Sequence, residues 1–331
     1  MKKSKLAIVS FLVIAFGFML FSGVPIVDAK KIIIKCAHNG NEAHPYQKGY
    51  EKFKEIIEAR SNGEVEVQIF PNAQLGSEEE VNQMIKMGTV AVNTASTGGL
   101  AGFVPEIELF NLPFIFRDLD HFYKVVDGPV GKRIGKSIED RLNCVFLGWW
   151  YSGIRNAWNN KVVIKSPADL KGLKIRTMGS PIFVDTWNAL GAQATPMSFG
   201  ELYTGLQQGV VDGAECDMVD LWVEKFYEVT KYVSFTKHMF LANVLIMSKK
   251  HYDNFSPAIQ TAIWEAAEAA KVAERQALEH MTNTLQSQLE DKGLEFYDVD
   301  QKPFIQGVEG VYKKNSEKVG GMELIKIVQS Q

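Results

Sequence analysis

One segment near the C-terminus limits the possible fold more than any other part of this chain. From Ser256 to Gly293 the sequence is rich in Ala, Glu, Gln and Lys, and apolar residues such as Ile259 and Ile263 recur at helical spacing. Ser256 and Pro257 are a typical N-cap and first-turn pair, and Gly293 is a typical helix end. Helices of globular proteins average about 11–12 residues. We therefore expect one very long helix that contacts two separate parts of the protein.

The rest of the chain alternates short apolar strands with amphipathic helices. The predicted strands are IIIKCAH, EVEVQIF, VAVNTAS, NCVFLGWWY, LKIRTM and VVDGAEC. Capping boxes, Ser77 with Glu80 and Ser198 with Glu201, mark the start of two of the helices. Strands separated by helices of about 10–15 residues predict right-handed parallel crossovers and a three-layer α/β sandwich.

Length, charge and cysteine content narrow the class of protein. The 331 residues exceed one typical core of about 100–200 residues, so we expect two lobes. The net charge of -3 does not favour nucleic acid as a partner. Cys36, Cys144 and Cys216 are far apart and odd in number, which predicts buried thiols rather than a disulfide framework or a metal site.

The N-terminus has the pattern of an export signal. Three lysines within the first five residues precede a charge-free apolar run that ends at Val27, and a small-residue cleavage site follows. The run is long enough to span a bilayer at about 20 residues, so an uncleaved anchor is the alternative. Pro25 and Asp28 interrupt its end. We therefore predict cleavage after Ala29 and a soluble protein in the periplasm.

Two arginines among apolar, aromatic and glycine residues are the leading candidates for a binding site. Arg155 follows the strand NCVFLGWWY, and Arg176 lies inside the strand LKIRTM. Both lie near strand ends, where ligands collect in doubly wound sheets. A guanidinium can hold a carboxylate through two parallel hydrogen bonds, which an ammonium cannot. The alternative is that each arginine pairs with a nearby Asp or Glu.

Polar residues that follow two other strands are further candidates. His38, Asn39 and His44 lie between the first strand and the first helix, and Ser96 and Thr97 follow VAVNTA. An asparagine side chain both donates and accepts, which suits hydroxyl or carboxylate recognition. For the two histidines a turn or capping role is favoured over metal binding, because no third ligand is close in sequence.

Aromatic residues and the absence of catalytic motifs bear on the kind of site that this chain carries. The aromatic side chains expected in the core, of which one or two would instead stack on a ligand, are Trp149, Trp150, Trp158, Trp187, Phe199 and Trp222. The sequence contains no GxSxG, HExxH, GxxxxGK[ST] or strand-linked GxGxxG motif. This favours a binding protein over an enzyme, and predicts neither a metal site nor a cofactor.

Several long segments together resemble one family. They are PNAQLGSEEEVNQMIKMGTV, FVPEIELFNLPFIF, ADLKGLKIRTMGSPIFVDTWNALGAQATPMSFGELYTGLQQGVVDGAE, FYEVTKYVSFTKH and SPAIQTAIWEAA. With them the chain resembles, over nearly its whole mature length, the periplasmic solute-binding proteins of tripartite ATP-independent periplasmic (TRAP) transporters, the DctP-like group. The resemblance implies two α/β lobes, joined by crossing strands and a long spanning helix, that close over a ligand. It also implies a monomer that delivers its solute to the membrane subunits of the transporter.

The resemblance divides the mature chain and assigns pocket positions. Lobe I is expected to comprise residues 30–153 and 242–281, and lobe II residues 154–241 and 282–331. The arginine that grips the carboxylate falls on Arg176 and a second one on Arg155, while Asn39, Ser96 and Phe199 fall on other pocket positions.

Two departures from the sialic acid binders of the family bear on the ligand. Those proteins carry an asparagine at the position of Cys216 and an acidic residue at the position of Ser96, which argues against sialic acid. The inferred pocket is otherwise uncharged, with Asp217 available for hydroxyls, and suits a monocarboxylate such as a sugar acid, hydroxy acid or oxo acid. A C4-dicarboxylate is the alternative, and it would need a further cation that only a protonated His38, His44 or His238 could supply. The sequence also leaves open a sensor subunit that reports the solute and an exported sugar-acid enzyme.

Overall fold

The computed structural model describes residues 31–331. The predicted leader and its cleavage site lie outside these residues. Within them, no helix combines the length and the apolar character needed to cross a lipid bilayer.

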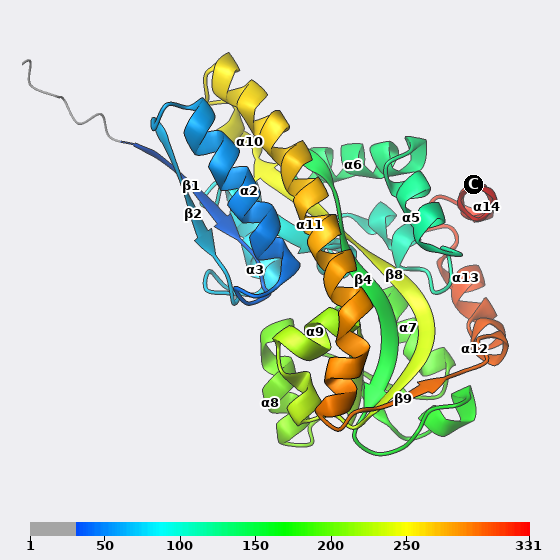
Figure 1. Cartoon of the computed structure of the whole chain (residues 1–331). Helices are drawn as coiled ribbons and strands as arrows, with labels where there is room; N and C mark the ends of the chain where they lie inside the picture. Colours follow the sequence, from blue (N-terminus) through cyan, green and yellow to red (C-terminus); the bar gives the residue numbers. More distant parts are fainter. Residues whose placement is uncertain (1–30) are drawn as a thin grey trace, which may run out of the picture.

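A mixed sheet runs through two lobes. Its strands are β1 (Ile32–Ala37), β2 (Val65–Phe70), β3 (Val92–Ser96), β4 (Cys144–Asn159), β5 (Lys174–Thr177), β6 (Gln193–Pro196), β7 (Gly213–Cys216), β8 (Tyr232–Ser248) and β9 (Glu295–Asp298). Their order is β2-β1-β3-β8-β4-β7-β5-β6, and β9 pairs with β8. Strands β1 to β3 belong to lobe I and β5 to β7 to lobe II. The two long strands β4 and β8 pass through both lobes (Figure 1).

The prediction of parallel crossovers holds only within each lobe. Strand β1 is parallel to β2 and β3, and β5 is parallel to β6 and β7. In contrast, β4 and β8 pair with each other, and with β7 and β3 respectively, in antiparallel fashion. Because β8 is buried over most of its length, its sequence lacks the polar alternation that would have marked it as a strand.

Helices cover the sheet on both sides. They are α2 (Pro45–Arg60), α3 (Glu78–Met87), α4 (Thr97–Leu100), α5 (Leu119–Val126), α6 (Pro129–Leu142), α7 (Pro181–Ala189), α8 (Leu202–Gln207), α9 (Met218–Val223), α10 (Lys249–Tyr252), α11 (Pro257–Asp291), α12 (Lys302–Gly307), α13 (Glu309–Asn315) and α14 (Met322–Ser330), with short 3-10 turns at 105–111, 167–170, 199–201 and 226–228. Both predicted capping boxes are present, at Ser77 and Ser198. The second one opens a 3-10 turn that leads into α8.

Helix α11 spans both lobes, as the sequence predicts. It has 35 residues and packs against α2 of lobe I, the crossing strand β4 and α9 of lobe II. Figure 1 shows it running along the whole length of the molecule. Its N-cap forms as expected, since the Ser256 side chain accepts a hydrogen bond from the Ile259 amide.

The C-terminal segment returns from one lobe to the other. Helix α13 packs on α7 of lobe II, and α14 lies beside α5 of lobe I (Figure 1). The His121 ring nitrogen Nε2 lies 2.8 Å from the Val328 carbonyl, and the Tyr312 hydroxyl donates to the Pro113 carbonyl at 2.6 Å. The predicted lobe boundaries stay a prediction, but these contacts place the end of the chain against both lobes.

The three cysteines are buried and free, as predicted. Burial raises the pKa of each thiol above its ordinary value. These side chains therefore behave as small apolar groups in the core rather than as nucleophiles.

Candidate functional site

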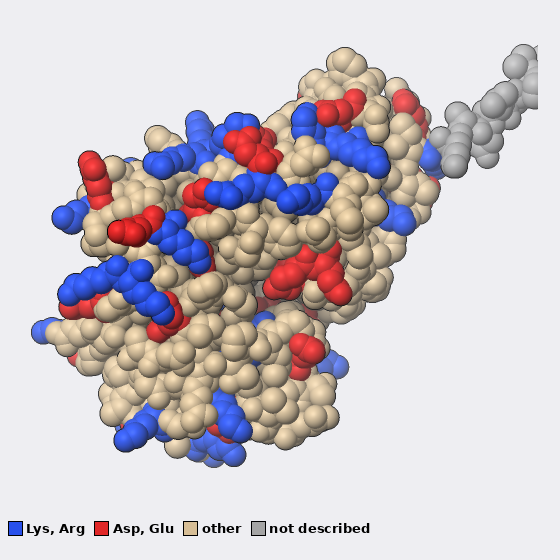
Figure 2. All heavy atoms as spheres, turned by 180° about the vertical axis from the view of Figure 1, so that it is seen from behind, with Lys and Arg blue, Asp and Glu red and all other residues tan. Residues whose placement is uncertain are grey.

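A cavity of about 720 Å³ lies between the two lobes. Figure 2 shows the hollow from behind, with acidic side chains gathered at its margin. Lobe I contributes α3, the end of β3 and the loop after β1. Lobe II contributes the ends of β5 and β7 and the segment that contains Phe199. Six of the ten predicted site residues line this cavity: Asn39, Ser96, Arg155, Arg176, Phe199 and Cys216.

Arg176 brings a buried positive charge to the cavity. Its side chain is only 2 % exposed, and its Nε donates to the Met197 carbonyl at 2.9 Å. Its Nη1 faces no acceptor among residues 31–331, and no carboxylate of this part of the chain lies within ion-pair distance. Burial lowers the pKa of Arg176 from its ordinary value, but a guanidinium keeps its proton in a protein. The fold therefore holds, against the cavity, a cation that has no ion-pair partner in the described part of the chain.

Arg155 is also buried, but a carboxylate already holds it. Its Nη2 donates to Glu215 Oε1 at 2.9 Å, and its Nε donates to Oε2 of the same carboxylate. His238 lies 3.3 Å from Glu215 Oε2. Burial alone would raise the pKa of Glu215, but Arg155 and His238 together hold it below its ordinary value. The sequence left open whether each arginine pairs with a nearby Asp or Glu. Arg155 does so, and within residues 31–331 Arg176 does not.

Irregularities of strand β4 aim Arg155 at the cavity. The pairing of β4 with β8 shifts register between Tyr151 and Gly153 and again between Arg155 and Ala157. Gly153 has φ 116°, and a Cβ on it would lie 2.6 Å from the Asp217 Cβ. Only glycine fits this place without strain. Bulges of this kind redirect side chains next to binding sites.

The remaining four predicted residues lie behind the cavity wall, and two of them pack in lobe I. Trp150 is buried with its ring 5.5 Å from that of Tyr50, so it belongs to the core rather than to a stacking surface. His38 stacks on the same tyrosine and contacts Gln47, and burial lowers the pKa of His38 to about 4. A neutral, enclosed histidine cannot act as the extra cation.

Thr97 and Asp217 are buried and do not line the cavity. Thr97 is buried at the first position of α4, and its backbone carbonyl accepts from the Asn111 side-chain nitrogen at 3.2 Å. Asp217 is the N-cap of α9 and accepts from the Asp220 amide at 2.9 Å. Both follow strand ends, where small polar residues commonly start helices. The position after a strand end indicated the right region, but it could not separate a residue that lines the cavity, such as Ser96, from residues buried behind the cavity wall.

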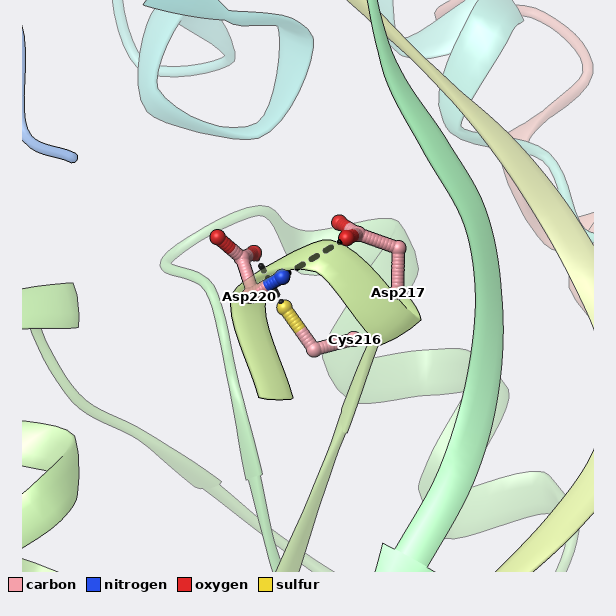
Figure 3. A group of neighbouring side chains, drawn as sticks. All are labelled: Cys216, Asp217 and Asp220. Atoms are coloured by element: carbon pink, nitrogen blue, oxygen red, sulfur yellow. Dashed lines mark hydrogen bonds between the residues drawn. The ribbon is translucent and has the colours of Figure 1, made fainter. Parts of the chain in front are cut away.

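A cluster of Cys216, Asp217 and Asp220 offers three candidate metal-ligand atoms within 4.8 Å of one another (Figure 3). Its members are already engaged. The Cys216 thiol donates to Asp220 Oδ2, and the His44 ring lies 3.4 Å from Asp220 Oδ1. Burial and the charge of Asp220 raise the pKa of Asp217 well above its ordinary value, whereas His44 and Cys216 hold that of Asp220 down. With a protonated thiol and the guanidinium of Arg155 close by, this is a poor setting for a cation.

His44 also caps helix α2, as its predicted capping role requires. Its Nδ1 accepts from the Tyr46 amide at 3.2 Å. The Tyr46 hydroxyl reaches Ser152 Oγ at 2.8 Å and accepts from the Asn243 amide, and these three residues line the cavity. This network has no local signal in the sequence, because Tyr46 lies inside a helix and Asn243 inside an apolar strand.

Glu78 is the most consequential residue of the cavity that was not predicted from the sequence. It is the first residue of α3, it lines the cavity, and it accepts a hydrogen bond from the Ser96 amide. Its Oε2 lies 3.5 Å from the Asn39 side-chain nitrogen. Burial, and then the neighbouring Glu79, raise the pKa of Glu78 to about 7. The run of three glutamates, residues 78–80, could have indicated a functional carboxylate, because the capping box explains only Glu80.

Direct contacts join the lobes along one side of the cavity. The Asn41 amide donates to Glu224 Oε1 at 2.9 Å, and the Asn41 side chain donates to the Val223 carbonyl. On another part of the rim the Ser96 hydroxyl lies 3.7 Å from Met178 Sδ. The structure therefore shows the lobes in contact around the cavity.

The charges at the cavity are unequal. The charged side chains that line it are Arg155 and Arg176 on one hand and Glu78, Glu79, Glu80, Glu201 and Asp220 on the other. Since Glu215 neutralises Arg155, Arg176 is the cation left for an anionic ligand. The site can accommodate one carboxylate at Arg176 but has little positive charge for a second one.

Comparisons with known proteins agree with this geometry. Residues 36–318 match the family model of bacterial extracellular solute-binding proteins, family 7. The chain is similar to the 2,3-diketo-L-gulonate-binding periplasmic protein of Escherichia coli, with 33% identity over 76% of this chain and 77% of that protein.

Solved structures of similar architecture carry organic acids. A TRAP periplasmic solute-binding protein from Polaromonas, bound to D-erythronate, superposes with a TM-score of 0.88 at 32% identity, over 91% of this chain and 99% of that one. One from Sulfurospirillum deleyianum, with bound succinate, gives a TM-score of 0.86 at 31% identity, over 90% of this chain and 98% of that one.

Proposed function

The chain belongs to family 7 of the bacterial extracellular solute-binding proteins, and we propose that it captures a hydroxylated monocarboxylate between its lobes and delivers it to a TRAP carrier. The observation that carries this proposal is the buried guanidinium of Arg176, which lines an interlobe cavity without a carboxylate partner among residues 31–331. A buried charge of this kind is costly unless a partner of opposite charge joins it. A ligand carboxylate would complete the pair.

Each lobe would contribute a different kind of contact to the solute. Arg176, with Phe199 beside its guanidinium at 5.9 Å, would hold the carboxylate from lobe II. Asn39 and Ser96 would face the remainder of the molecule from lobe I, and Ser152 and Asn243 offer further polar groups from the crossing strands. A solute that contacts both lobes stabilises the closed form by its differential affinity for that form. The membrane subunits would then recognise the closed shape.

The acids bound to the relatives support this ligand class. The named ligand of the Escherichia coli relative is a keto sugar acid, and that of the Polaromonas protein is a four-carbon sugar acid. Succinate in the Sulfurospirillum protein keeps a C4-dicarboxylate as the second candidate. The histidines proposed to hold a second carboxylate do not favour it here. His38 and His238 have lowered pKa values because they are buried, and His44 contacts Asp220.

We further propose that the protein does not transform its ligand and that it works in the periplasm as a monomer after removal of residues 1–29. The acids of the cavity that have defined partners serve structure, such as Glu80 in a capping box and Asp220 beside His44. A product assay on the bound acid tests the absence of turnover, and mass measurement of the exported protein tests the cleavage site.

A thermal-shift screen of organic acids on residues 30–331 tests the ligand class. A solute at 100 times its Kd should stabilise the fold by about 2.7 kcal/mol. We expect sugar acids to produce the largest shifts. Stabilisation by no carboxylate at all, or by neutral sugars alone, would refute the proposal. A thermal shift that requires a membrane kinase partner would instead favour a sensor subunit.

A further inference from the structure

The side of the cavity that lobe I forms carries a second selective group, the carboxylate of Glu78. Glu78 projects from the first turn of α3 in lobe I, whereas Arg176 belongs to β5 in lobe II, and both line the same cavity. The two charges are of opposite sign and lie on different lobes. A solute held between the lobes therefore meets a cation on lobe II and a carboxylate on lobe I.

The carboxylate of Glu78 is fixed but not saturated. Its Oε1 accepts from the Ser96 amide, and its Oε2 has only the long contact of 3.5 Å to Asn39. An ionised carboxylate is an acceptor with about four lone-pair sites and has no hydrogen to donate. The free capacity on Oε2 therefore suits a donor, and a hydroxyl group is the donor that a sugar acid carries.

The surrounding backbone leaves space for this carboxylate. A Cβ added to Gly99 would lie 2.4 Å from Glu78 Oε1, closer than any real contact. Gly99 lines the cavity directly beside Ser96, whose backbone amide holds the same oxygen. Any side chain at position 99 would therefore displace the carboxylate from its position in the wall.

We propose that Glu78 determines which acids this protein accepts, because its carboxylate accepts hydrogen bonds from the hydroxyl groups of a monocarboxylate and repels a second carboxylate at the same end of the cavity. This inference rests on the proposed function, since it requires that Arg176 holds the first carboxylate. It concerns only the far end of the ligand.

The electrostatic surroundings of Glu78 add a pH dependence to this selectivity. The groups that face it are Glu79 and Glu80 on its own helix, Arg176 on β5 and His38 after β1. His38 is uncharged above about pH 5, because its pKa is lowered to about 4. The pKa of Glu78 is raised to about 7, so its carboxylate takes up a proton as the pH falls through the neutral range. A protonated Glu78 no longer repels a second carboxylate, so dicarboxylate binding should improve as the pH falls.

D-Erythronate and succinate are matched compounds for a test, because both have four-carbon chains. D-Erythronate carries hydroxyl groups where succinate carries a second carboxylate. Titration calorimetry at about pH 8 compares both acids on the wild type and on Glu78→Gln. The amide keeps an oxygen for the Ser96 amide but removes the charge. Because a hydrogen bond to a charged group is stronger than one to a neutral group, and because the repulsion of a second carboxylate is removed, we expect roughly tenfold weaker binding of D-erythronate and roughly tenfold tighter binding of succinate. The preference between the two acids then shifts by about 100-fold.

Two further measurements keep the inference testable if Glu78→Gln folds poorly. In the wild type, succinate affinity should rise about fivefold between about pH 8 and about pH 6, while D-erythronate affinity should fall by a similar factor, because protonation removes the charge of Glu78 as Glu78→Gln does. The folded variant, where it can be made, corrects for the titration of succinate itself. Gly99→Ala keeps the charge of Glu78 but displaces it, and should also weaken the preference for D-erythronate.

Glu79→Gln separates a direct contact from the general charge of the cavity. It removes the same charge from the adjacent, more exposed residue, so its effect on the preference should be much smaller than that of Glu78→Gln. Equal effects of the two variants, or an unchanged preference in Glu78→Gln, would overturn the inference while sugar-acid binding stands. Failure of the wild type to bind any carboxylate would overturn the proposed function and this inference together.

Discussion

The two arginines of the cavity should respond to the same substitution in opposite ways. Arg155 and Arg176 are both almost completely buried, and both line the cavity. Only Arg155 has a carboxylate partner, Glu215, within residues 31–331. Methionine has a similar length and no charge, so Arg155→Met and Arg176→Met form a matched pair. One substitution breaks an ion pair, and the other removes a cation that has no such partner.

The stability of the ligand-free protein separates the two variants first. Arg155→Met leaves the fully buried Glu215 with only His238 at 3.3 Å. Breaking a buried pair by removing one partner costs about 3–5 kcal/mol, a large share of the total stability of about 5–15 kcal/mol. Arg176→Met loses the hydrogen bond to Met197 but also relieves the desolvation of a charge. We expect a change in the free energy of unfolding of about 1 kcal/mol or less in either direction.

Ligand affinity should follow the reverse order in the variants that fold. Loss of the Arg176 guanidinium should weaken binding of a sugar acid by about 2–5 kcal/mol, which corresponds to roughly 30- to 5,000-fold in Kd. Urea unfolding and titration calorimetry measure the two quantities independently. The double variant Arg155→Met with Glu215→Met is the control, because replacing a buried pair by apolar residues is often neutral for stability. Two results would refute this reasoning. One is an Arg176→Met variant that loses as much stability as Arg155→Met, and the other is an Arg176→Met variant whose Kd for the sugar acid lies within a few-fold of the wild-type value.

Three further predictions address Glu274, a buried residue of α11 whose carboxyl group accepts from the Tyr151 amide, the contact between the lobes at Asn41, and a helix cap. Burial raises the pKa of Glu274 to about 8, so its contribution to stability is fully present below about pH 4.5 and is lost as the pH rises towards 8, by at most about 1.4 kcal/mol per pH unit. Glu274→Gln should abolish this dependence in urea unfolding curves and be more stable than the wild type at pH 8, and parallel pH profiles would contradict the assignment. Asn41→Ala removes a hydrogen bond between the lobes, so the ligand should dissociate about 2- to 10-fold faster in stopped-flow measurements, with an unchanged association rate. Ser77→Ala should cost about 0.5–2 kcal/mol of unfolding free energy through loss of the α3 cap, whereas Ser77→Thr should retain most of it.

The sequence was sufficient to predict those elements whose ends are marked by residues close together in the chain. The ends of α11 follow from Ser256, Pro257 and the glycine after Lys292, and the cap of α3 follows from residues only three positions apart. The antiparallel pairing of β4 with β8 could not be predicted in this way. Its partners are far apart in sequence, and bulges within it disturb the alternation of side chains. Register across such a distance depends on packing that no local pattern encodes.

The same distinction explains which site residues were found. Arg155 and Arg176 were recognised by their apolar surroundings, but the choice between ligand and ion pair depends on Glu215, 60 positions from Arg155. Glu78 has the appearance of an ordinary helix start, since acidic residues are common in a first turn. Only the tertiary structure shows that this first turn lines the same cavity as Arg176.

The placement of charge also indicates why closure should depend on the ligand. In an open form, water can solvate the Arg176 guanidinium and the Glu78 carboxylate, and closure removes that water from both. Without a ligand, closure leaves Arg176 with only the Met197 carbonyl, so the cost of desolvation opposes it. An acid that pairs with Arg176 and donates hydroxyls to lobe I offsets this cost on both sides at once. A ligand that satisfies only one lobe has little differential affinity for the closed state and cannot shift the equilibrium far, however well it contacts that lobe.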